Sequence, residues 1–400
     1  MNHPNLADIK SCTGCMACVD SCAKQAITCV INEEGHYFYN IEEDKCVLCH
    51  KCEKVCPIVS GYQYGTNDLK SSQPFAVWAK EESFRKTATS CGVFPALAQN
   101  IIQQGGVVFG ALQEQFYVHH EQIDSEEEIV KLQGSKYTQS NTKGVYQQVK
   151  HALNEGRKVL FSGVGCQTAA LLSFLGEDKN VENLFTVDLI CGGVPSNYLI
   201  KRFVEEYEDN IGKIVSYRTK SKYELTVEDK NGVNFTMPAD SRPLPLYGFT
   251  TGATERYSCY DCPFAKGHRM SDITIGDFWG NTLFPEQNGK GVSVAIAHSV
   301  KGQDLLNSAN LEIQEIKWRD FLFKNPRAVY GKGTIPRSRY HLAKAFNSYD
   351  YEKLLEDYAN KGSWKRPITK LNRVVRIIKG VVLNKIRQRK VENVLKNNNL

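Results

Sequence analysis

Short apolar runs alternate with helical patterns through the middle of the chain, and this alternation predicts an α/β fold. Five apolar runs have the length of buried strands: 75–79, 106–111, 158–163, 184–190 and 291–297. Three segments between them place apolar residues at helical spacing: 93–102, 146–155 and 169–175. Two successive strand–loop–helix units, starting at residues 158 and 184, indicate a parallel sheet.

Other segments make the expected sheet a mixed one. Residues 115–119 are expected beside the strand at 106–111, and 291–297 is expected to be the last buried strand. Three segments alternate with turn signals and are expected to pair in antiparallel fashion: 214–219, 223–228 and 233–237. The predicted class is therefore α/β with α+β features, in which a mixed-sheet domain lies between an N-terminal unit and a helical C-terminal tail.

Glycine, proline and polar residues mark the expected domain boundaries. Residues 1–62 form a first unit, which a polar linker up to Pro74 separates from the rest. Residues 74–150 and 151–345 are expected to be the two parts of the mixed-sheet domain, and residues 346–400 the tail. A chain of 400 residues has room for two or three domains.

Eight of the fourteen cysteines fall in two N-terminal runs, each with the spacing C-x2-C-x2-C-x3-C. This is the ligand spacing of bacterial two-cluster ferredoxins, in which the fourth Cys of a run usually serves the other cluster. Thiolates are soft ligands that suit iron–sulfur clusters. The spacing predicts two 4Fe–4S clusters, one held by Cys12, Cys15, Cys18 and Cys56, the other by Cys46, Cys49, Cys52 and Cys22.

Zinc is the alternative ligand for these runs, but zinc sites usually join two Cys pairs that lie a dozen or more residues apart. Each run is expected to lead into a short helix, with β-type segments at 27–31 and 37–41. Ala23 stands where Pro57 stands in the second run, and this difference is expected to loosen the first turn without removing a ligand.

A loop of small residues precedes the helical pattern at 93–102. Thr89 and Ser90 stand where helix N-caps belong. Unpaired N–H groups at a helix N-terminus can bind an anion, so this loop is a candidate phosphate site, with an ordinary capped helix as the alternative. Cys91 lies in the same loop, where a reactive and a structural thiol are both compatible with the sequence.

Four cysteines outside the ferredoxin runs are enough for one more cluster. Cys166 and Cys191 follow adjacent expected strands, and Cys259 and Cys262 form a C-x2-C pair. The carboxyl ends of parallel strands are where α/β sheets present ligand sites. A third 4Fe–4S cluster is one interpretation; buried free cysteines and a zinc-binding pair are the others. Cys29 is expected in the core.

The cysteine usage of a chain this long does not fit a disulfide scaffold, and exposed cubane clusters imply a reducing interior. We find no secretory signal and no apolar run long enough to span a membrane. The expected location is cytoplasmic.

Net charge is uneven along the chain. Residues 363–400 hold eleven Lys or Arg and one Glu, a net charge of +10, so the rest of the chain, at +6 overall, carries −4. Apolar residues interleave with the basic ones at 373–389, which predicts a basic amphipathic helix on the inner face of an anionic membrane. A solvated helix is the alternative, and nothing else in the chain supports a nucleic-acid partner.

Taken together and in this order, several motifs resemble the coenzyme F420 hydrogenase/dehydrogenase beta subunit family, a family of iron–sulfur flavoproteins. The matching stretches are 85–94, 134–140, 160–176, 188–195, 259–262 and 271–280. The last of them reads Ser-Asp-Ile-Thr-Ile-Gly-Asp-Phe-Trp-Gly and is the most specific. With the ferredoxin runs, the resemblance extends from residue 12 to about residue 320.

The resemblance implies a non-covalent FAD and a third 4Fe–4S cluster in the core. Residues expected at the FAD phosphates are Arg85, Thr89, Ser90 and Gly92, and those expected at the flavin, its ribityl chain or the same cavity are Lys136, Tyr137, Gln167 and the loop around Asp277. Family members usually carry Ser-Gly-Gly where this chain has Ser90-Cys91-Gly92, and because a glycine can adopt φ > 0, the loop is expected to differ here.

The expected function is that of an iron–sulfur flavoprotein oxidoreductase. Electrons would pass between the clusters and FAD, which would reduce or oxidise a small molecule, with ferredoxin, deazaflavin or a nicotinamide coenzyme as redox partner. Some similar proteins are associated with surface polysaccharide synthesis. The alternative is an electron-transfer subunit docked on another redox enzyme. No catalytic residue is assigned, because Lys136, Tyr137 and His268, the candidate proton donors, are better explained as structural or cofactor-contacting residues.

Overall fold

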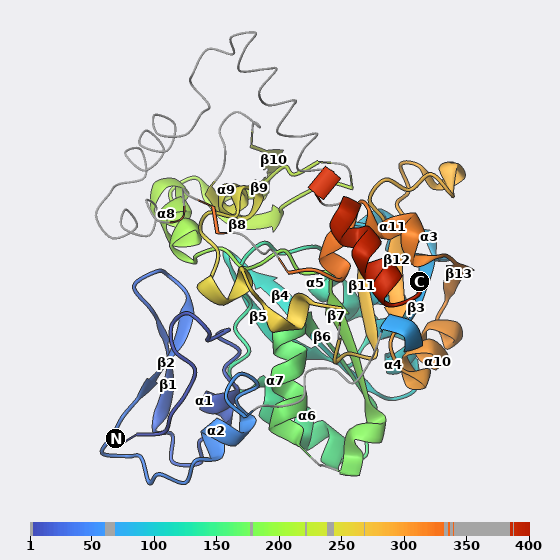
Figure 1. The fold of residues 1–400 in the computed structure, drawn as a ribbon. Helices are drawn as coiled ribbons and strands as arrows, with labels where there is room; N and C mark the ends of the chain where they lie inside the picture. The colour runs from blue at the N-terminus through green and yellow to red at the C-terminus, as the bar shows by residue number, and fades with distance from the viewer. Residues whose placement is uncertain are drawn as a thin grey trace.

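The computed structural model describes residues 3–60, 69–176, 179–220, 222–237, 244–267, 269–331, 335–336, 339, 385–386 and 388–400. An eight-stranded mixed sheet crosses the main domain (Figure 1). Its strand order is β13-β3-β12-β11-β7-β6-β4-β5. The strands are β3 (Gln73–Ala79), β4 (Val107–Glu114), β5 (Tyr117–Ile123), β6 (Val159–Val164), β7 (Leu184–Leu189), β11 (Ile273–Asp277), β12 (Ser293–Ala297) and β13 (Leu311–Glu315).

The four central strands β4, β6, β7 and β11 run parallel, and the outer strands pair in antiparallel fashion. The predicted α/β class with a mixed sheet is therefore confirmed. Strands from residues 74–150 and from residues 151–345 share this one sheet, because β3 lies between β12 and β13.

Helices cover both faces of the parallel strands, so these strands are largely apolar on both sides. The helices of the main domain are α3 (Glu82–Thr87), α4 (Val93–Gln103), α5 (Ile129–Leu132), α6 (Val145–Asn154), α7 (Gly165–Leu175), α8 (Tyr198–Tyr207), α9 (Leu244–Thr251), α10 (Val300–Ser308) and α11 (Trp318–Leu322). Val108 and Leu160 face the core formed by α4 and α10. Phe109 and Phe161 face a second core, formed by α6 and α7.

The N-terminal unit consists of α1 (Ala17–Ser21), β1 (Ile27–Ile31), β2 (Tyr37–Ile41) and α2 (Lys51–Val55). β1 and β2 pair with each other as one antiparallel hairpin between the two cysteine runs. Both short helices pack against α7, so the unit lies against the main domain (Figure 1). A separate three-stranded antiparallel sheet contains β8 (Ile211–Ser216), β9 (Thr226–Asp229) and β10 (Asn234–Thr236).

Strand β12 is buried at every position, as expected for the last buried strand, and β13 follows it at the sheet edge with a single buried position. Two expectations from the sequence are wrong. Helix α7 begins at Gly165, so Cys166 lies in its first turn and not in a preceding loop. The N-cap of α4 is Gly92, at φ 82°, and not Thr89 or Ser90.

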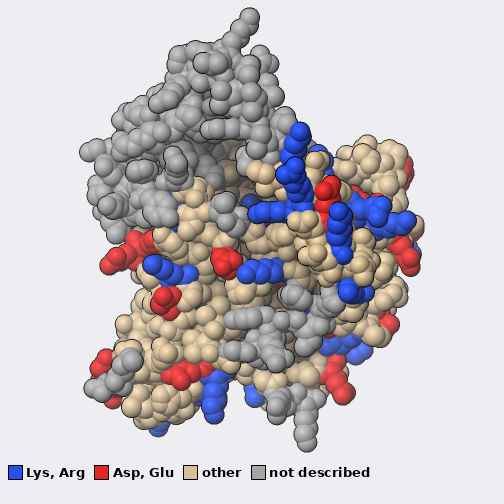
Figure 2. Space-filling model, viewed as in Figure 1, with Lys and Arg blue, Asp and Glu red and all other residues tan. Residues whose placement is uncertain are grey.

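Residues 61–68 of the expected linker and most of the basic tail lie outside the described residues. At the C-terminal end, residues 388–397 are helical, and Val391 and Leu395 are buried in the core that contains α4 and α10. Lys and Arg side chains gather over this end of the chain on the face drawn in Figure 2, whereas the N-terminal unit shows both signs. None of the helices in the described ranges has the length and apolar character that crossing a bilayer requires.

Candidate functional site

The two cysteine runs adopt the same unusual backbone. Gly14 and Leu48, which occupy equivalent positions 34 residues apart, have φ of 65° and 53°. The residues two positions further on, Met16 and His50, have φ of 62° and 58°. A left-handed conformation is uncommon for residues other than glycine and costs on the order of 1 kcal/mol or more at each. Its recurrence at matched positions indicates that both loops are shaped for the same purpose.

Cys12, Cys15, Cys18 and Cys56 line one apolar cavity, together with Leu6, Met16 and Tyr39 among others. Burial, with smaller contributions from the charges of Cys56 and Cys12, raises the pKa of Cys15 to about 12. Thiolates crowded in an apolar cavity need a cationic partner, so this cavity fits the ligand set of a metal cluster. Among the described residues, no three His, Cys, Asp or Glu side chains lie close enough together to bind a single metal ion. The four thiolates that hold a cubane lie farther apart than the ligands of a single ion.

The second predicted ligand set is more open to solvent. Cys52 is buried, and burial raises its pKa to about 11, with a smaller contribution from the charge of Cys49. Cys22 packs against the apolar cluster that contains Cys52, Cys46 is half-buried and Cys49 is exposed. Val47 and Leu48, in the loop between Cys46 and Cys49, are 59% and 43% exposed.

Side chains of the main domain bind the first cysteine loop by its backbone. Every carbonyl oxygen from Cys12 to Cys15 accepts a hydrogen bond from the body of the protein. The donors are Ser258 to Cys12 at 3.0 Å, Gln139 to Thr13 at 3.3 Å and to Gly14 at 3.2 Å, and Thr142 and Tyr146 to Cys15 at 2.9 and 2.8 Å. The loop is therefore held rigidly on the main domain.

The four remaining candidate ligands come together in the main domain. Cys166 follows β6, Cys191 follows β7, and Cys259 and Cys262 lie in the segment before β11. Burial raises the pKa of Cys166 well above its usual value, and the charges of Cys262, Cys191 and Cys259 raise it further. The four thiols are thus within electrostatic reach of one another and could hold one cluster.

The charge of Cys15 also raises the pKa of Cys166. Tyr146 is fully buried and is affected by both thiols, since the charges of Cys15 and Cys166 contribute to its raised pKa. The first cysteine loop and the group in the main domain are therefore neighbours across the interface between α1 and α7.

The residues expected at the FAD phosphates have partners within the protein. Nη2 of Arg85 donates to the carbonyl of Gly291 at 2.9 Å. Oγ1 of Thr89 accepts the backbone N–H of Ser135 at 2.9 Å. These contacts connect the loop before α4 to the segments 134–140 and 291–293.

Ser90 and Cys91 contact the same residue of β12. Oγ of Ser90 lies 3.1 Å from Oγ of Ser293, and Sγ of Cys91 donates to that Oγ at 2.9 Å. Cys91 is fully buried, and burial raises the pKa of its thiol. The structure therefore favours a structural role for Cys91.

Lys136 and Tyr137 lie on the segment beside this loop. The ammonium of Lys136 donates to the carbonyls of Leu132 and Gln133, and burial lowers its pKa to about 7. The ring of Tyr137 stacks on Phe249, with centroids 4.0 Å apart. Gln167 lies in the first turn of α7 and accepts the N–H of Val164 at 3.0 Å.

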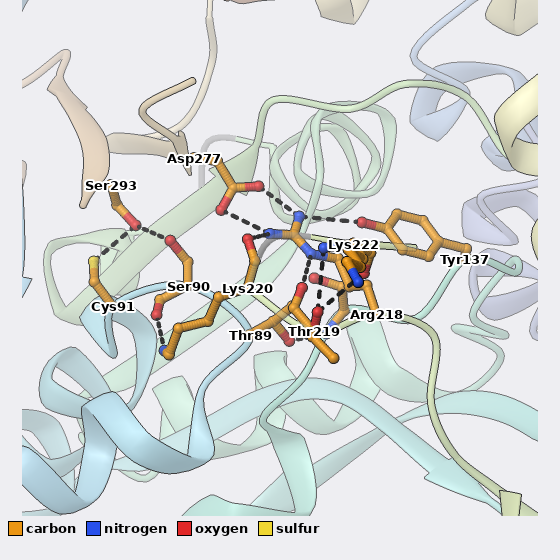
Figure 3. Close-up of polar contacts among 11 residues, drawn as sticks. Thr89, Ser90, Cys91, Tyr137, Arg218, Thr219, Lys220, Lys222, Asp277 and Ser293 are labelled. Atoms are coloured by element: carbon orange, nitrogen blue, oxygen red, sulfur yellow. Dashed lines mark hydrogen bonds and ion pairs between the residues drawn. The ribbon is translucent and has the colours of Figure 1, made fainter. Parts of the chain in front are cut away.

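Two cations that were not expected from the sequence reach this region from the segment after β8 (Figure 3). Arg218 forms an ion pair with Asp277 at 2.6 Å and lies 5.2 Å from the centroid of the Trp279 ring. The ammonium of Lys220 donates to the carbonyls of Arg85 at 2.6 Å and Ala88 at 3.0 Å, and also to that of Ser90. The signal in the sequence that could have identified them is their spacing, two basic residues separated by one position after a strand.

These contacts fit a flat, anionic cofactor. Lys220 brings a positive charge to the loop before α4, Arg218 lies nearby in its ion pair with Asp277, and the rings of Tyr137, Phe249 and Trp279 lie beside them. The side chain of Arg218 in this ion pair is only 5% exposed. His268, a third candidate proton donor, lies outside the described residues.

Two segments of the chain, one in the N-terminal unit and one in the main domain, match known protein-family models. Residues 156–319 match the family model for the C terminus of the beta subunit of coenzyme F420 hydrogenase/dehydrogenase, and residues 11–59 match the 4Fe-4S dicluster domain. No curated protein matches the chain. Among solved structures, a chain of the F420-reducing [NiFe] hydrogenase complex from Methanosarcina barkeri is 17% identical, at a TM-score of 0.44, with 74% of this chain and 96% of that chain covered. Residues 156–319 therefore match the C-terminal domain of the coenzyme F420 hydrogenase/dehydrogenase beta subunit, and residues 11–59 are a 4Fe–4S dicluster domain.

Proposed function

We propose that the chain is an iron–sulfur flavoprotein oxidoreductase in which single electrons pass from the dicluster domain through a core cluster to FAD. The observation that carries this proposal is the nearness of Cys15, in the first cysteine loop, to Cys166, in the main domain. The two groups of thiols come from different domains, and their nearness gives electrons a short path across the interface.

The exposure of the sites supports an order for the relay. The loop of Cys46 and Cys49 is open to solvent, as a site of electron entry from a redox partner must be. The cavity of Cys12 and Cys56 lies between these sites, because the main domain binds the backbone of its loop and Cys56 packs in the same apolar cluster as Cys52. The thiols of the main domain come last, and burial is the largest cause of the raised pKa of Cys166.

The ligands follow from these contacts. Cys12, Cys15, Cys18 and Cys56 would hold the middle cluster, and Cys46, Cys49, Cys52 and Cys22 the outer one. The core cluster would be held by Cys166, Cys191, Cys259 and Cys262. Iron–sulfur clusters supply one-electron steps at potentials that the protein tunes by charge, hydrogen bonds and solvent exposure.

The region shown in Figure 3 would hold FAD, which gathers single electrons into pairs for transfer to a partner molecule. Lys220, Arg85 at the end of α3, and Thr89, Ser90 and Gly92 in the loop before α4 would face the phosphates. Tyr137, Lys136 and Gln167 would line the flavin side. Lys136 is buried with a pKa of about 7, so it can hold or release a proton there at neutral pH.

Anaerobic purification of the full chain, with iron, sulfide and flavin quantified, tests the proposal. Three cubane clusters and one FAD per chain are expected. Reduction with reduced ferredoxin, reduced deazaflavin, NADH and NADPH in parallel would then identify the class of electron donor. A preparation with two clusters and no flavin would contradict the proposal.

One observation favours a second function, that of an electron-transfer subunit docked on another redox enzyme. Ile9, Val47 and Leu48 are exposed apolar side chains of the dicluster domain, at 43%, 59% and 43% exposure. Exposed apolar side chains around an accessible cluster would suit a protein partner. Such a subunit would lack turnover with a small molecule when purified alone, yet it would still accept electrons from its partner.

The basic tail supports a further proposal, that the protein binds the anionic inner face of the cell membrane through residues 363–400. The sequence there is basic and amphipathic, and Lys and Arg gather around the C-terminal end in Figure 2. Sedimentation with anionic vesicles, with and without this segment, tests it; equal binding would reject it. Surface polysaccharide synthesis, suggested by the resemblance, is the proposed metabolic setting.

A further inference from the structure

Arg256 is buried at the junction of the dicluster domain and the main domain. Its side chain is 1% exposed. The guanidinium donates to the carbonyl of Tyr37 at 2.6 Å, to the carbonyl of Cys12 at 3.3 Å and to Oε1 of Gln139 at 2.8 Å. It also packs directly on the first cysteine loop, because a Cβ built on Gly14 would lie 2.4 Å from Nη2.

This guanidinium has no carboxylate partner among the residues that the structure describes, and its Nε has no hydrogen-bond partner. Two other arginines that are equally buried do have one: Arg269 pairs with Asp188 at 3.2 Å, and Arg339 with Glu34 at 2.5 Å. His36, which is near both Arg256 and Arg339, cannot compensate a cation. Its pKa lies well below the usual value because of burial and of these two charges.

An uncompensated buried charge costs several kcal/mol, so one is rarely kept without a counter-charge. A group beside this guanidinium that could supply negative charge is the cavity lined by Cys12, Cys15, Cys18 and Cys56. A cubane held by four thiolates carries a net negative charge, which the apoprotein lacks. The contact of Arg256 with the backbone of Cys12 places the cation beside that cavity.

We propose that Arg256 is the counter-charge of the cluster held by Cys12, Cys15, Cys18 and Cys56, and that it raises the reduction potential of this cluster. The proposal rests on the proposed function, which supplies the cluster. Reduction adds one electron and no bond changes, so the cluster becomes more negative by one charge. A fixed cation in a low-dielectric site stabilises the reduced form more than the oxidised form.

The backbone of Arg256 contacts the segments that carry the cysteines of the core. Its N–H donates to the carbonyl of Val194 at 3.0 Å, and its carbonyl accepts the N–H of Cys259 at 3.0 Å. The residue thus spans from the cysteines of the core to the first cysteine loop. It is a positioning residue that makes the middle cluster the better electron acceptor for the exposed one.

Redox titration of the anaerobically purified full chain, followed by electron paramagnetic resonance, tests this proposal. In Arg256→Gln, the midpoint of the middle cluster should fall by at least the equivalent of a tenfold change in its reduction equilibrium, about 59 mV for one electron. Arg256→Lys keeps the charge and should restore most of the potential. Comparison with Cys56→Ala, which should lack this cluster, identifies the signal.

A matched control removes a buried pair instead of a lone charge. The double variant Glu34→Gln with Arg339→Gln takes away both partners, so the midpoint should stay at the wild-type value. A second variant, Gln139→Glu, places a carboxylate beside the retained Arg256 and should also lower the midpoint. If Arg256→Gln does not assemble its clusters, the midpoint of Gln139→Glu tests the proposal instead.

The content of iron and sulfide separates the two ways of failing. Clusters absent from the wild-type protein would overturn the proposed function. Full cluster content in Arg256→Gln or Gln139→Glu with an unchanged midpoint would overturn the role of Arg256 alone.

Discussion

The hydroxyl of Tyr146 donates a 2.8 Å hydrogen bond to the carbonyl of Cys15 and so joins helix α6 of the main domain to the first cysteine loop. Tyr146 is fully buried, and Thr142 donates to the same carbonyl at 2.9 Å. The loop that would hold the middle cluster is therefore fixed by the domain that would receive its electrons.

Removing both donors should loosen this junction. Tyr146→Phe alone leaves Thr142 in place and should cost about 1 kcal/mol of unfolding free energy. Tyr146→Phe with Thr142→Val leaves the carbonyl of Cys15 unsatisfied and should cost about 1–3 kcal/mol more. Thermal unfolding measures both, and the rate of electron transfer from the dicluster domain to the core should fall in the double variant. Tyr117→Phe, at a site that is 51% exposed, is the control and should change neither.

Cys56 is predicted to serve the cluster of the first run although it belongs to the second. Cys56→Ala should therefore lower the iron and sulfide content by one cubane and remove the signal of the middle cluster while the outer cluster stays. The reason is geometric, since Cys56 lines the cavity of Cys12, Cys15 and Cys18. Cys29→Ala, on β1 and away from that cavity, should keep all the iron. Loss of the outer cluster instead would show that the ligand sets are assigned the wrong way round.

Cys166 is expected to bind the core cluster. Cys166→Ala should keep the iron of the dicluster domain, lose one cubane and interrupt electron flow to the flavin. Cys91→Ala is the matched control, because Cys91 is a fully buried thiol of the same domain, hydrogen-bonded to Val77 and Ser293. It should reduce stability with no loss of iron. Equal iron content in the two variants would argue for a free thiol at position 166.

Lys220 is expected to hold the cofactor loop. Its ammonium binds the carbonyl of Arg85 at the end of α3 and two carbonyls of that loop, so Lys220→Met should remove a charge-assisted contact worth about 1.5–3 kcal/mol. FAD should then bind about ten- to a hundredfold more weakly, as measured by flavin retention and fluorescence titration. Lys222→Met removes a neighbouring lysine that is 72% exposed and pairs with Glu224 at 3.8 Å. If Lys222→Met weakens FAD as much as Lys220→Met does, the contacts of Lys220 are irrelevant to binding.

Stability should fall in acid partly through His120. Its ring lies 2.7 Å from Oγ of Ser140 and 3.0 Å from the carbonyl of Ser162, and burial lowers its pKa from 6.5 to about 4. The unfolded chain binds this proton more readily than the folded chain. The stabilisation is therefore complete above pH 6.5 and is lost as the pH falls towards 4.

In His120→Gln, this part of the acid destabilisation, on the order of 3 kcal/mol, should disappear. Denaturant unfolding at several pH values measures it. His119→Gln replaces a half-exposed neighbour and should leave the wild-type slope unchanged. A His120→Gln profile parallel to that of the wild type would count against the proton linkage.

Two kinds of feature could be read from the sequence, because each is local. The strands at 75–79, 158–163 and 184–190 are continuous apolar runs, and such runs are buried wherever the chain places them. The cysteine spacing predicted two ferredoxin-type loops, since ligands a few residues apart must share one turn. Its confirmed counterpart is the dicluster domain at residues 11–59.

Other features depend on contacts between distant segments, which local pattern cannot reveal. Strand β13 is half-buried at the sheet edge and lacks a continuous apolar run, so only its pairing with β3 identifies it. Lys220 and Arg256 look like ordinary basic residues in the sequence. Folding brings one against a loop 130 residues away and the other against a loop 244 residues away. Spacing along the chain thus determined which cysteines could share a cluster, while the tertiary structure decided which charges surround them, because electrostatic environment depends on distance in space and not on position in the sequence.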